Sequence, residues 1–340
     1  MRNPLLTARC CTSGPAQVIS DLVRRLYASN LPTNAAGALA KSIGTRFQNG
    51  RSLPELAGLG SYFFVPYPQF MGGIYVIDSN DYSHYNGLEI RLQRAFSNGL
   101  SFQFAYTLSK SMDTRSFDPT STVVSTGTAQ SAGNTPFDLH NRYGNYALSD
   151  FDRRHVVQGN WAYELPFGPN KKFFAHVPGG LRHLVGGWEV AGFLTVFSPR
   201  PFTVWSGQYT SSSVVTSTAD CSACSYGMGT VFDDSASGCK WFFNASQISK
   251  FSNPAPGSMG NTGRNGFAQP WLWDMDMSLL KRVQITERHR VEFRAEAYNL
   301  TNSVSFGYPT TSIASGTLGR IKDSVVSGSR KIQLGLKYSF

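Results

Sequence analysis

The last ten residues of the chain constrain its fold more than any other segment. Lys331 to Phe340 alternates without a break, and its apolar residues are Ile332, Leu334, Leu336, Tyr338 and Phe340. This period of two predicts a β-strand with one apolar and one polar face. The ends of soluble proteins tend to fray, whereas a transmembrane strand of about 10 residues turns one face to lipid and the other to a lumen. We therefore expect a membrane-spanning strand that runs to the end of the chain.

Seven further segments are predicted to be strands. Residues 100–110 are the clearest, because Leu100, Phe102 and Phe104 alternate with polar or small residues and the pattern continues to Leu108. The preceding Asn98-Gly99 has the composition of a tight hairpin turn. The other predicted strands are 73–78, 85–96, 153–165, 187–198, 271–283 and 290–299. We expect an all-β fold in which about eight antiparallel strands form part of a larger transmembrane β-barrel.

The connections between these strands alternate in length. Residues 111–150, 199–270 and 300–328 form long connections, whereas those at Asn98, around Pro169 and at Thr286 are shorter. Outer-membrane barrels have short periplasmic turns and long extracellular loops. If the chain ends in the periplasm, counting back from Phe340 places all three long connections outside the cell. The pattern predicts the outer membrane of a Gram-negative bacterium.

Composition agrees with a barrel and argues against two other classes. Aromatic residues make up 13% of the chain and charged residues only 15%, and no run approaches the ~20 apolar residues that a membrane helix needs. The formal net charge is +10, but Lys and Arg are scattered singly along strands and turns. A nucleic-acid binder gathers them on one face or helix. We therefore expect no nucleic-acid partner.

Three of the five cysteines, Cys221, Cys224 and Cys239, lie in the second long connection. A Cys-x-x-Cys pair with one further cysteine and no nearby histidine is at most half of a zinc site. In an oxidising extracellular loop, these residues predict one disulfide and one remaining thiol, and the sequence leaves the pairing open. We expect neither a metal nor a cofactor.

Some polar residues raise the question of catalysis. Asp274, Asp276, Glu292, Arg294 and Glu296 fall on the polar side of neighbouring strands, where a carboxylate cluster could serve acid–base chemistry. A polar lumen wall with paired charges explains the same pattern, and we favour it. His140 and His155 come without a Gly-x-Ser-x-Gly motif, and residues 257–266 lack the Lys-Ser/Thr ending of a phosphate loop. We expect no enzyme.

Aromatic residues in the second long connection leave two interpretations open. Tyr209, Tyr226, Trp241, Phe242 and Phe243 either stack on a ligand or pack the loop upon itself. The sequence favours neither.

The chain divides into a poorly defined segment, residues 1–60, and a barrel portion, residues 61–340. Residues 16–27 have helical spacing, and 35–43 are expected to form another short helix. The N-terminus lacks a convincing signal peptide, because only a short apolar stretch separates Arg2 from Arg9. A membrane barrel must be exported. We therefore expect either a misassigned start or the C-terminal part of a longer protein.

Seven short segments occur in the order of one family's motifs. They are Pro66–Phe70, Tyr85–Leu92, Phe104–Asp113, Ser149–His155, Tyr163–Gly168, Gly186–Val190 and Arg294–Asn302. Together they resemble the barrel of Oar-like TonB-dependent outer-membrane receptors, from about residue 60 to the end. The resemblance implies a barrel of about 22 strands with an internal plug, and uptake powered through TonB.

This chain shows neither a plug nor a TonB-contacting segment, so it is similar to the C-terminal third of such a receptor. The implied partners are outer-membrane lipid, the barrel assembly machinery, the TonB system in the full-length receptor and an unidentified extracellular ligand. The resemblance also implies that the terminal aromatic strand, with Tyr338 and Phe340, is the signal for barrel assembly. The alternative is a structural or adhesive outer-membrane protein without transport activity. A secreted β-sandwich or carbohydrate-binding module is a third interpretation.

Overall fold

The computed structural model describes most of the chain after residue 80. The described residues are 47–48, 51–52, 58, 80–116, 138, 141–169, 171–209, 216–224, 231–234, 238–255, 258–321, 324–326 and 328–340. The predicted helices at 16–27 and 35–43 and the predicted strand at 73–78 lie outside them. Near the N-terminus, β1 (Phe47–Gln48) pairs with β2 (Arg51–Ser52).

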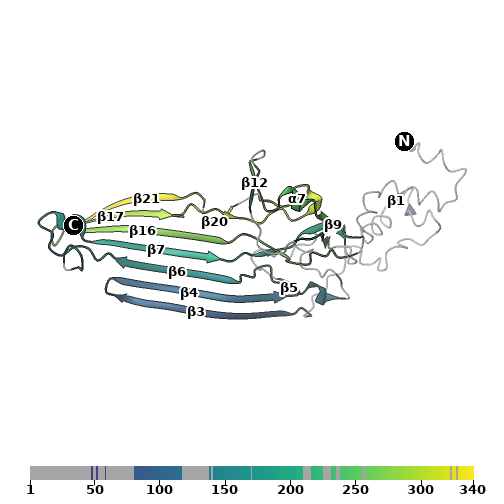
Figure 1. The fold of residues 1–340 in the computed structure, drawn as a ribbon, viewed down its shortest axis with the longest axis horizontal. Coiled ribbons are helices and arrows are strands. Elements are labelled where there is room, and N and C mark those ends of the chain that lie inside the picture. The colour runs from purple at the N-terminus through teal and green to yellow at the C-terminus, as the bar shows by residue number, and fades with distance from the viewer. Residues whose placement is uncertain are drawn as a thin grey trace.

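One antiparallel sheet dominates the described structure (Figure 1). Its spatial order is β21-β17-β16-β7-β6-β4-β3, and the short β5 pairs with the end of β4. The strands are β3 (Ser83–Ser97), β4 (Leu100–Asp113), β5 (Ala147–Leu148), β6 (His155–Glu164), β7 (Trp188–Phe197), β16 (Leu272–Gln284), β17 (Arg290–Tyr298) and β21 (Lys331–Ser339). Seven of the predicted segments are confirmed as strands, with ends that differ by a few residues.

The turn between β3 and β4 has the predicted chemistry. Asn98 and Gly99 both have positive φ, 53° and 77°. Two positive φ values in succession characterise the type I′ turn, whose twist matches that of the flanking strands. The register is interrupted between Arg94 and Ser97, one step before the turn.

Each strand contributes alternate residues to an apolar face and a polar face of the sheet. One continuous row of the apolar face runs across six strands: Phe102, Trp161, Gly192, Met277, Ala297 and Ile332. The adjacent row, one residue away along each strand, lies on the polar face. It contains Gln93, Gln103, Asn160, Phe193 and Asp276. Except at Phe193, the register aligns residues of like character across strands, so the predicted alternation holds in three dimensions.

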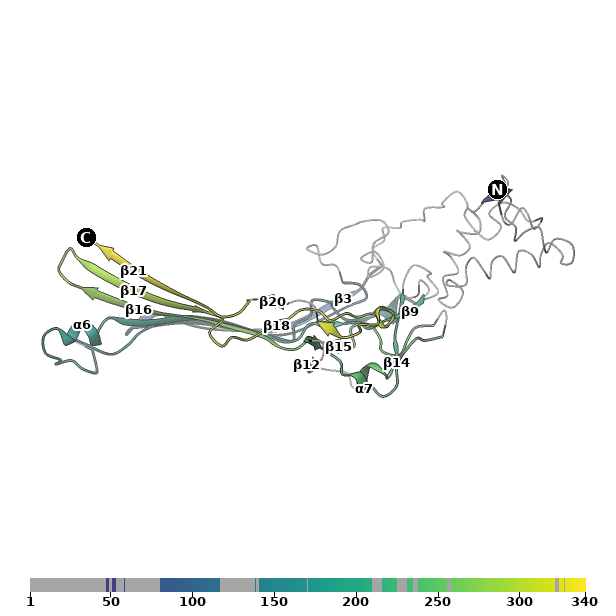
Figure 2. The ribbon, with the colours of Figure 1, turned by 90° about the horizontal axis from the view of Figure 1, so that it is seen from above.

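The sheet is open in the part of the chain that the structure describes. β3 and β21 are its two edges, and every residue of both strands is exposed. Viewed from above, the sheet is twisted, and β21, β17 and β16 spread apart toward the C-terminus (Figure 2). No closed barrel is formed by these residues.

The described parts of the long connections lie together at the end of the sheet opposite the C-terminus (Figures 1 and 2). Because successive strands are antiparallel, the links β4–β6, β7–β16 and β17–β21 all emerge there. The links β3–β4, β6–β7 and β16–β17 lie at the other end, and the second of these contains α6 (Leu181–Val185).

Short elements build a folded unit from the second and third long connections. We call the described residues of 198–271 and 299–330 the loop cap. Its elements are β8 (Pro201–Phe202), β9 (Trp205–Tyr209), β10 (Thr216–Thr218), β11 (Asp220–Cys221), β12 (Phe232–Asp234), β13 (Cys239–Trp241), α7 (Ala245–Ile248), β14 (Phe251–Ser252), β15 (Phe267–Ala268), β18 (Ser305–Phe306), η3 (Ile313–Ser315), β19 (Arg320–Ile321) and β20 (Ser324–Val326). In the first long connection, η2 (Arg142–Asn145) precedes β5.

Candidate functional site

The apolar face carries aromatic rings that lie over glycines of neighbouring strands. Gly159 sits opposite Phe104, and a Cβ at Gly159 would lie 2.3 Å from that ring. Gly192 sits opposite Trp161, and a Cβ there would lie 2.5 Å from the indole. Covering of strand glycines by aromatic rings restores contacts that the missing side chains cannot make. The face thus stays apolar across its glycine positions.

Aromatic residues mark both ends of the apolar face. At the loop-cap end, the His155 ring stacks between Tyr106 and Trp271, with centroid distances of 6.2 and 5.9 Å. His155 Nδ1 also lies 2.9 Å from the Tyr106 hydroxyl. At the other end, Tyr338 stacks on His289. Two bands of amphipathic rings are typical of the two membrane interfaces of a barrel.

Lys281 is a charged residue on this face that has identified partners. Its ammonium group donates to the backbone carbonyls of Leu184 and Gly186 and lies 4.9 Å from the centroid of the Trp188 ring. It sits beside α6, near the end of the strand, so its long side chain reaches polar groups at the boundary. The position agrees with a lysine at a membrane interface and not at the bilayer centre.

The polar face holds a chain of ion pairs. Arg282 donates to Glu189 at 2.7 Å and to Glu292 at 3.4 Å, and Arg294 donates to Glu292 at 2.9 Å and lies 3.6 Å from Glu296. The predicted Glu292, Arg294 and Glu296 are therefore brought together as paired charges on β17. They border a groove of about 340 Å³ between β17 and β21.

The two predicted aspartates do not join this cluster. Asp276 accepts a hydrogen bond from the backbone N–H of Asn299 at 2.8 Å, so it holds the end of β17. Asp274 lies nearer the loop cap on the same face. The five charged residues thus line a wall and do not converge on one catalytic centre. Within the described residues no group of His, Cys, Asp or Glu is placed to hold a metal ion.

The loop cap has a hydrophobic core of its own. Its buried members are Phe202, Val204, Ala219, Phe242, Phe243, Phe267, Leu318 and Ile321. Phe242 and Phe243 pack edge-to-face with a centroid distance of 4.9 Å, and β13 beside them pairs with β19 of the third connection. For these two residues, the structure favours packing within the loop over stacking on a ligand. Tyr226 and the side chain of Tyr209 lie outside the described residues.

A buried arginine joins the loop cap to the first long connection. The Arg264 side chain is 8% exposed and donates to the Asp113 carboxylate at 2.8 Å and to the Asp150 carboxylate at 3.0 Å. It also donates to Ser116 Oγ at 2.7 Å and to the Asn145 carbonyl. All three long connections are therefore linked. Sequence reasoning missed this residue, because its partners lie more than a hundred positions away.

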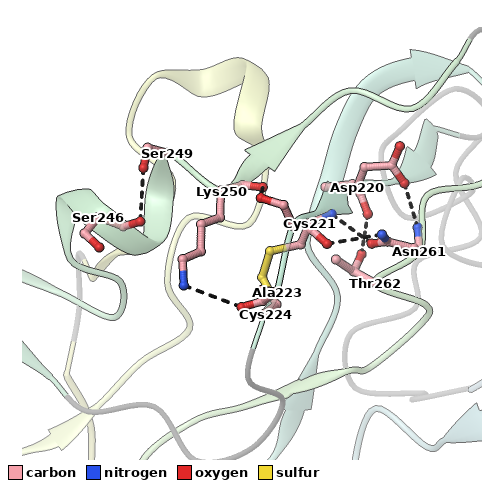
Figure 3. Close-up of a disulfide and its surroundings, with 11 residues drawn as sticks. Asp220, Cys221, Ala223, Cys224, Ser246, Ser249, Lys250, Asn261 and Thr262 are labelled. Atoms are coloured by element: carbon pink, nitrogen blue, oxygen red, sulfur yellow. Dashed lines mark hydrogen bonds between the residues drawn. A yellow bond between two sulfur atoms is a disulfide. The ribbon is translucent and has the colours of Figure 1, made fainter.

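In the structure, Cys221 is bonded to Cys224, with Cα atoms 5.7 Å apart (Figure 3). Asn261 holds the pair in place, since its Oδ1 accepts from the Cys221 N–H at 2.8 Å and its Nδ2 donates to the Cys221 carbonyl. The half-buried Cys239 is not part of this bond. The chemical pairing stays a prediction.

The remaining sequence candidates lie in different places. His155 is on the apolar face between aromatic rings, and His140 lies outside the described residues. The described part of 257–266 is a tightly packed loop, where a Cβ at Gly260 would lie 2.2 Å from the Thr218 carbonyl. Tyr338 and Phe340 lie at the exposed edge of the sheet, with centroids 5.9 Å apart. No helix among the described residues is long and apolar enough to cross a membrane.

Comparison with known families gives one match. A family model described as an outer membrane beta barrel domain matches residues 27–333, which is most of the chain. No curated protein and no solved structure gives a significant match.

Proposed function

This chain belongs to the outer membrane β-barrel domain family, and on that premise we propose that it supplies the C-terminal part of the barrel of a TonB-dependent uptake receptor. Membership implies a location in the outer membrane of a Gram-negative bacterium. The uptake role is supported by the motifs from Pro66–Phe70 to Arg294–Asn302, which follow the order of Oar-like receptors.

The observation that carries the proposal is a two-faced sheet with two open edges. Its apolar face suits lipid, and its charged face suits a lumen. β3 and β21 both present unpaired backbone groups in the described structure, and such edges are not stable in lipid. Further strands of the same receptor would pair with both edges and close the barrel.

The position of the loops supports the same orientation. The C-terminus lies with the shorter connections, and the loop cap lies at the opposite end. In this proposal the C-terminus is periplasmic and the loop cap faces the medium, where it meets the ligand before uptake.

One observation favours an adhesive role as the second candidate. The loop cap has its own buried core, so it presents a defined surface outside the membrane. A protein that only displays such a surface would need no energy from the inner membrane. TonB dependence therefore separates the two candidates.

The experiment compares cells with and without the full-length gene, in backgrounds with and without functional TonB. Growth is measured with peptides, oligosaccharides or ferric chelates as the limiting nutrient. An uptake receptor predicts at least one nutrient whose use requires both the gene and TonB. If no nutrient requires both, while attachment of cells to a surface requires the gene alone, uptake is refuted and the adhesive role is supported.

A further inference from the structure

Two arginines lie close together where the sheet meets the loop cap. Arg153 precedes β6 and Arg200 follows β7, and these strands are neighbours. The Arg153 guanidinium lies 4.9 Å from the centroid of the Phe197 ring, and the Arg200 guanidinium lies 5.5 Å from that of Tyr308. Burial lowers the pKa of Arg153, and the nearby charge of Arg200 lowers it further. The fold therefore holds two repelling cations side by side.

Backbone carbonyls are the hydrogen-bond acceptors of both side chains. Arg153 donates to the Ser198 carbonyl at 2.6 Å, and Arg200 donates to the Asp150 carbonyl at 3.2 Å. A guanidinium has five N–H donors, so each side chain retains donors beyond these bonds. Within the described residues, neither arginine forms an ion pair with a carboxylate.

The neighbouring carboxylates are engaged elsewhere. Asp150 Oδ1 accepts from Arg264 at 3.0 Å and from Asn265 at 2.7 Å. Asp152 Oδ1 accepts from the Ser111 N–H at 2.6 Å. These bonds hold both Oδ1 atoms to loop residues, and neither carboxylate forms an ion pair with Arg153 or Arg200.

The pair is open on the polar side of the sheet. Phe197, beneath Arg153, alternates with residues of the apolar face and shares the polar face with Thr195. Tyr308, beneath Arg200, is 43% exposed, and its hydroxyl donates to the Asp150 carbonyl at 3.4 Å. A solute in the lumen or at its mouth can reach Arg153 and Arg200 from the polar face. Lipid headgroups lie on the apolar side of the sheet.

We propose that Arg153 and Arg200, with Tyr308 beside them, bind an anionic group of a soluble ligand, a carboxylate or a phosphate. Paired guanidiniums offer planar donor pairs that match the oxygens of either group. Only one part of this inference rests on the proposed function, namely that the bound anionic group belongs to the imported ligand. The binding itself does not require transport.

The test uses the full-length protein in lipid-free detergent micelles. Isothermal titration at fixed ionic strength measures binding of inorganic phosphate and of succinate, with glucose as the neutral control. Arg153→Gln and Arg200→Gln should each weaken anion binding about tenfold or more, because each removes charged hydrogen bonds. Arg330→Gln is the matched control, since Arg330 also lies at this end and donates to one carbonyl. It should leave binding unchanged.

A second measurement needs only the unmodified protein, in case the variants do not fold. Phenylglyoxal modifies accessible arginines, and peptide mass spectrometry locates the adducts. Phosphate should protect Arg153 and Arg200 but not Arg330. The proposal is overturned if the unmodified protein binds neither anion, if protection is equal at all three arginines, or if folded variants bind normally. Binding that requires added lipopolysaccharide would overturn the assignment to a soluble ligand.

Failure of this site and failure of the uptake role are distinguishable. Anion binding that depends on Arg153 and Arg200, without any TonB-dependent nutrient, would refute uptake and leave the site standing. TonB-dependent uptake without arginine-dependent anion binding would refute the site alone.

Discussion

Replacing Arg264 with Met should weaken the attachment of the first long connection to the loop cap. The substitution removes the charged partner of Asp113, whose side chain is 5% exposed. Breaking a buried ion pair by removing one partner costs about 3–5 kcal/mol. The lower end applies here, because Ser116 Oγ still donates to Asp113 at 2.8 Å and Asp150 is 54% exposed. We expect a loss of about 3 kcal/mol in the local opening free energy of the loops.

Hydrogen exchange followed by mass spectrometry measures this loss in the folded, membrane-inserted protein. Amides of residues 258–266 should exchange about 100-fold faster in Arg264→Met, whereas those of β16 should not change. Arg330→Met serves as the control, because the side chain of Arg330 is exposed and donates to the Leu300 carbonyl. It should alter exchange by less than about threefold, as expected for a surface change of under about 0.5 kcal/mol.

A double variant tests the physical reason. In Arg264→Met with Asp113→Asn, the buried charge is gone as well, so the loss should be smaller than the sum of the two single losses. The coupling energy should be about 0.5–3 kcal/mol. Exchange in Arg264→Met that matches the parent protein, or strictly additive losses, would refute the role of the ion pair.

Three further outcomes are expected. Leu334→Arg should destabilise the barrel by about 2–4 kcal/mol during folding into lipid vesicles, whereas Gln333→Arg on the other face should be mild, and equal effects would contradict the assignment of faces. Peptide mapping of the exported protein without reduction should recover Cys221 linked to Cys224, and three free thiols in the loop would contradict a disulfide there. Deletion of Tyr338–Phe340 should abolish outer-membrane insertion of the protein, since the terminal strand must pair in lipid. Normal outer-membrane fractionation of the truncated form would refute the assignment of the final strand.

The strands could be predicted because their signal is local. In Leu100 to Lys110 each residue's face follows from its neighbours two positions away, and the Asn98-Gly99 turn supplies the positive φ values that the hairpin needs. The alternating lengths of the connections then predicted which end of the sheet each would occupy. The antiparallel pairing in the structure agrees with that prediction.

The loop cap could not be predicted in the same way. Arg264 pairs with Asp113 at a separation of 151 residues, and nothing in the local sequence marks either residue as buried. Phe242 and Phe243 presented two equal interpretations, and only their contacts with the core distinguish them. Long-range packing of irregular segments depends on the whole fold, whereas alternation depends on the strand alone.

The interfacial residues at the two ends of the apolar face also indicate the thickness of the bilayer that the sheet spans. Along β16, about ten residue steps separate Trp271 at the loop-cap end from Lys281 at the other, which corresponds to roughly 34 Å of extended chain. At the tilt of about 40° usual for barrel strands, the height is about 26 Å. Average bilayers have a hydrocarbon thickness of about 30 Å, and the outer membrane is thinner. The height of the apolar face thus matches a thin bilayer. A bilayer of short-chain lipids should therefore deform less around this protein than a bilayer of long-chain lipids.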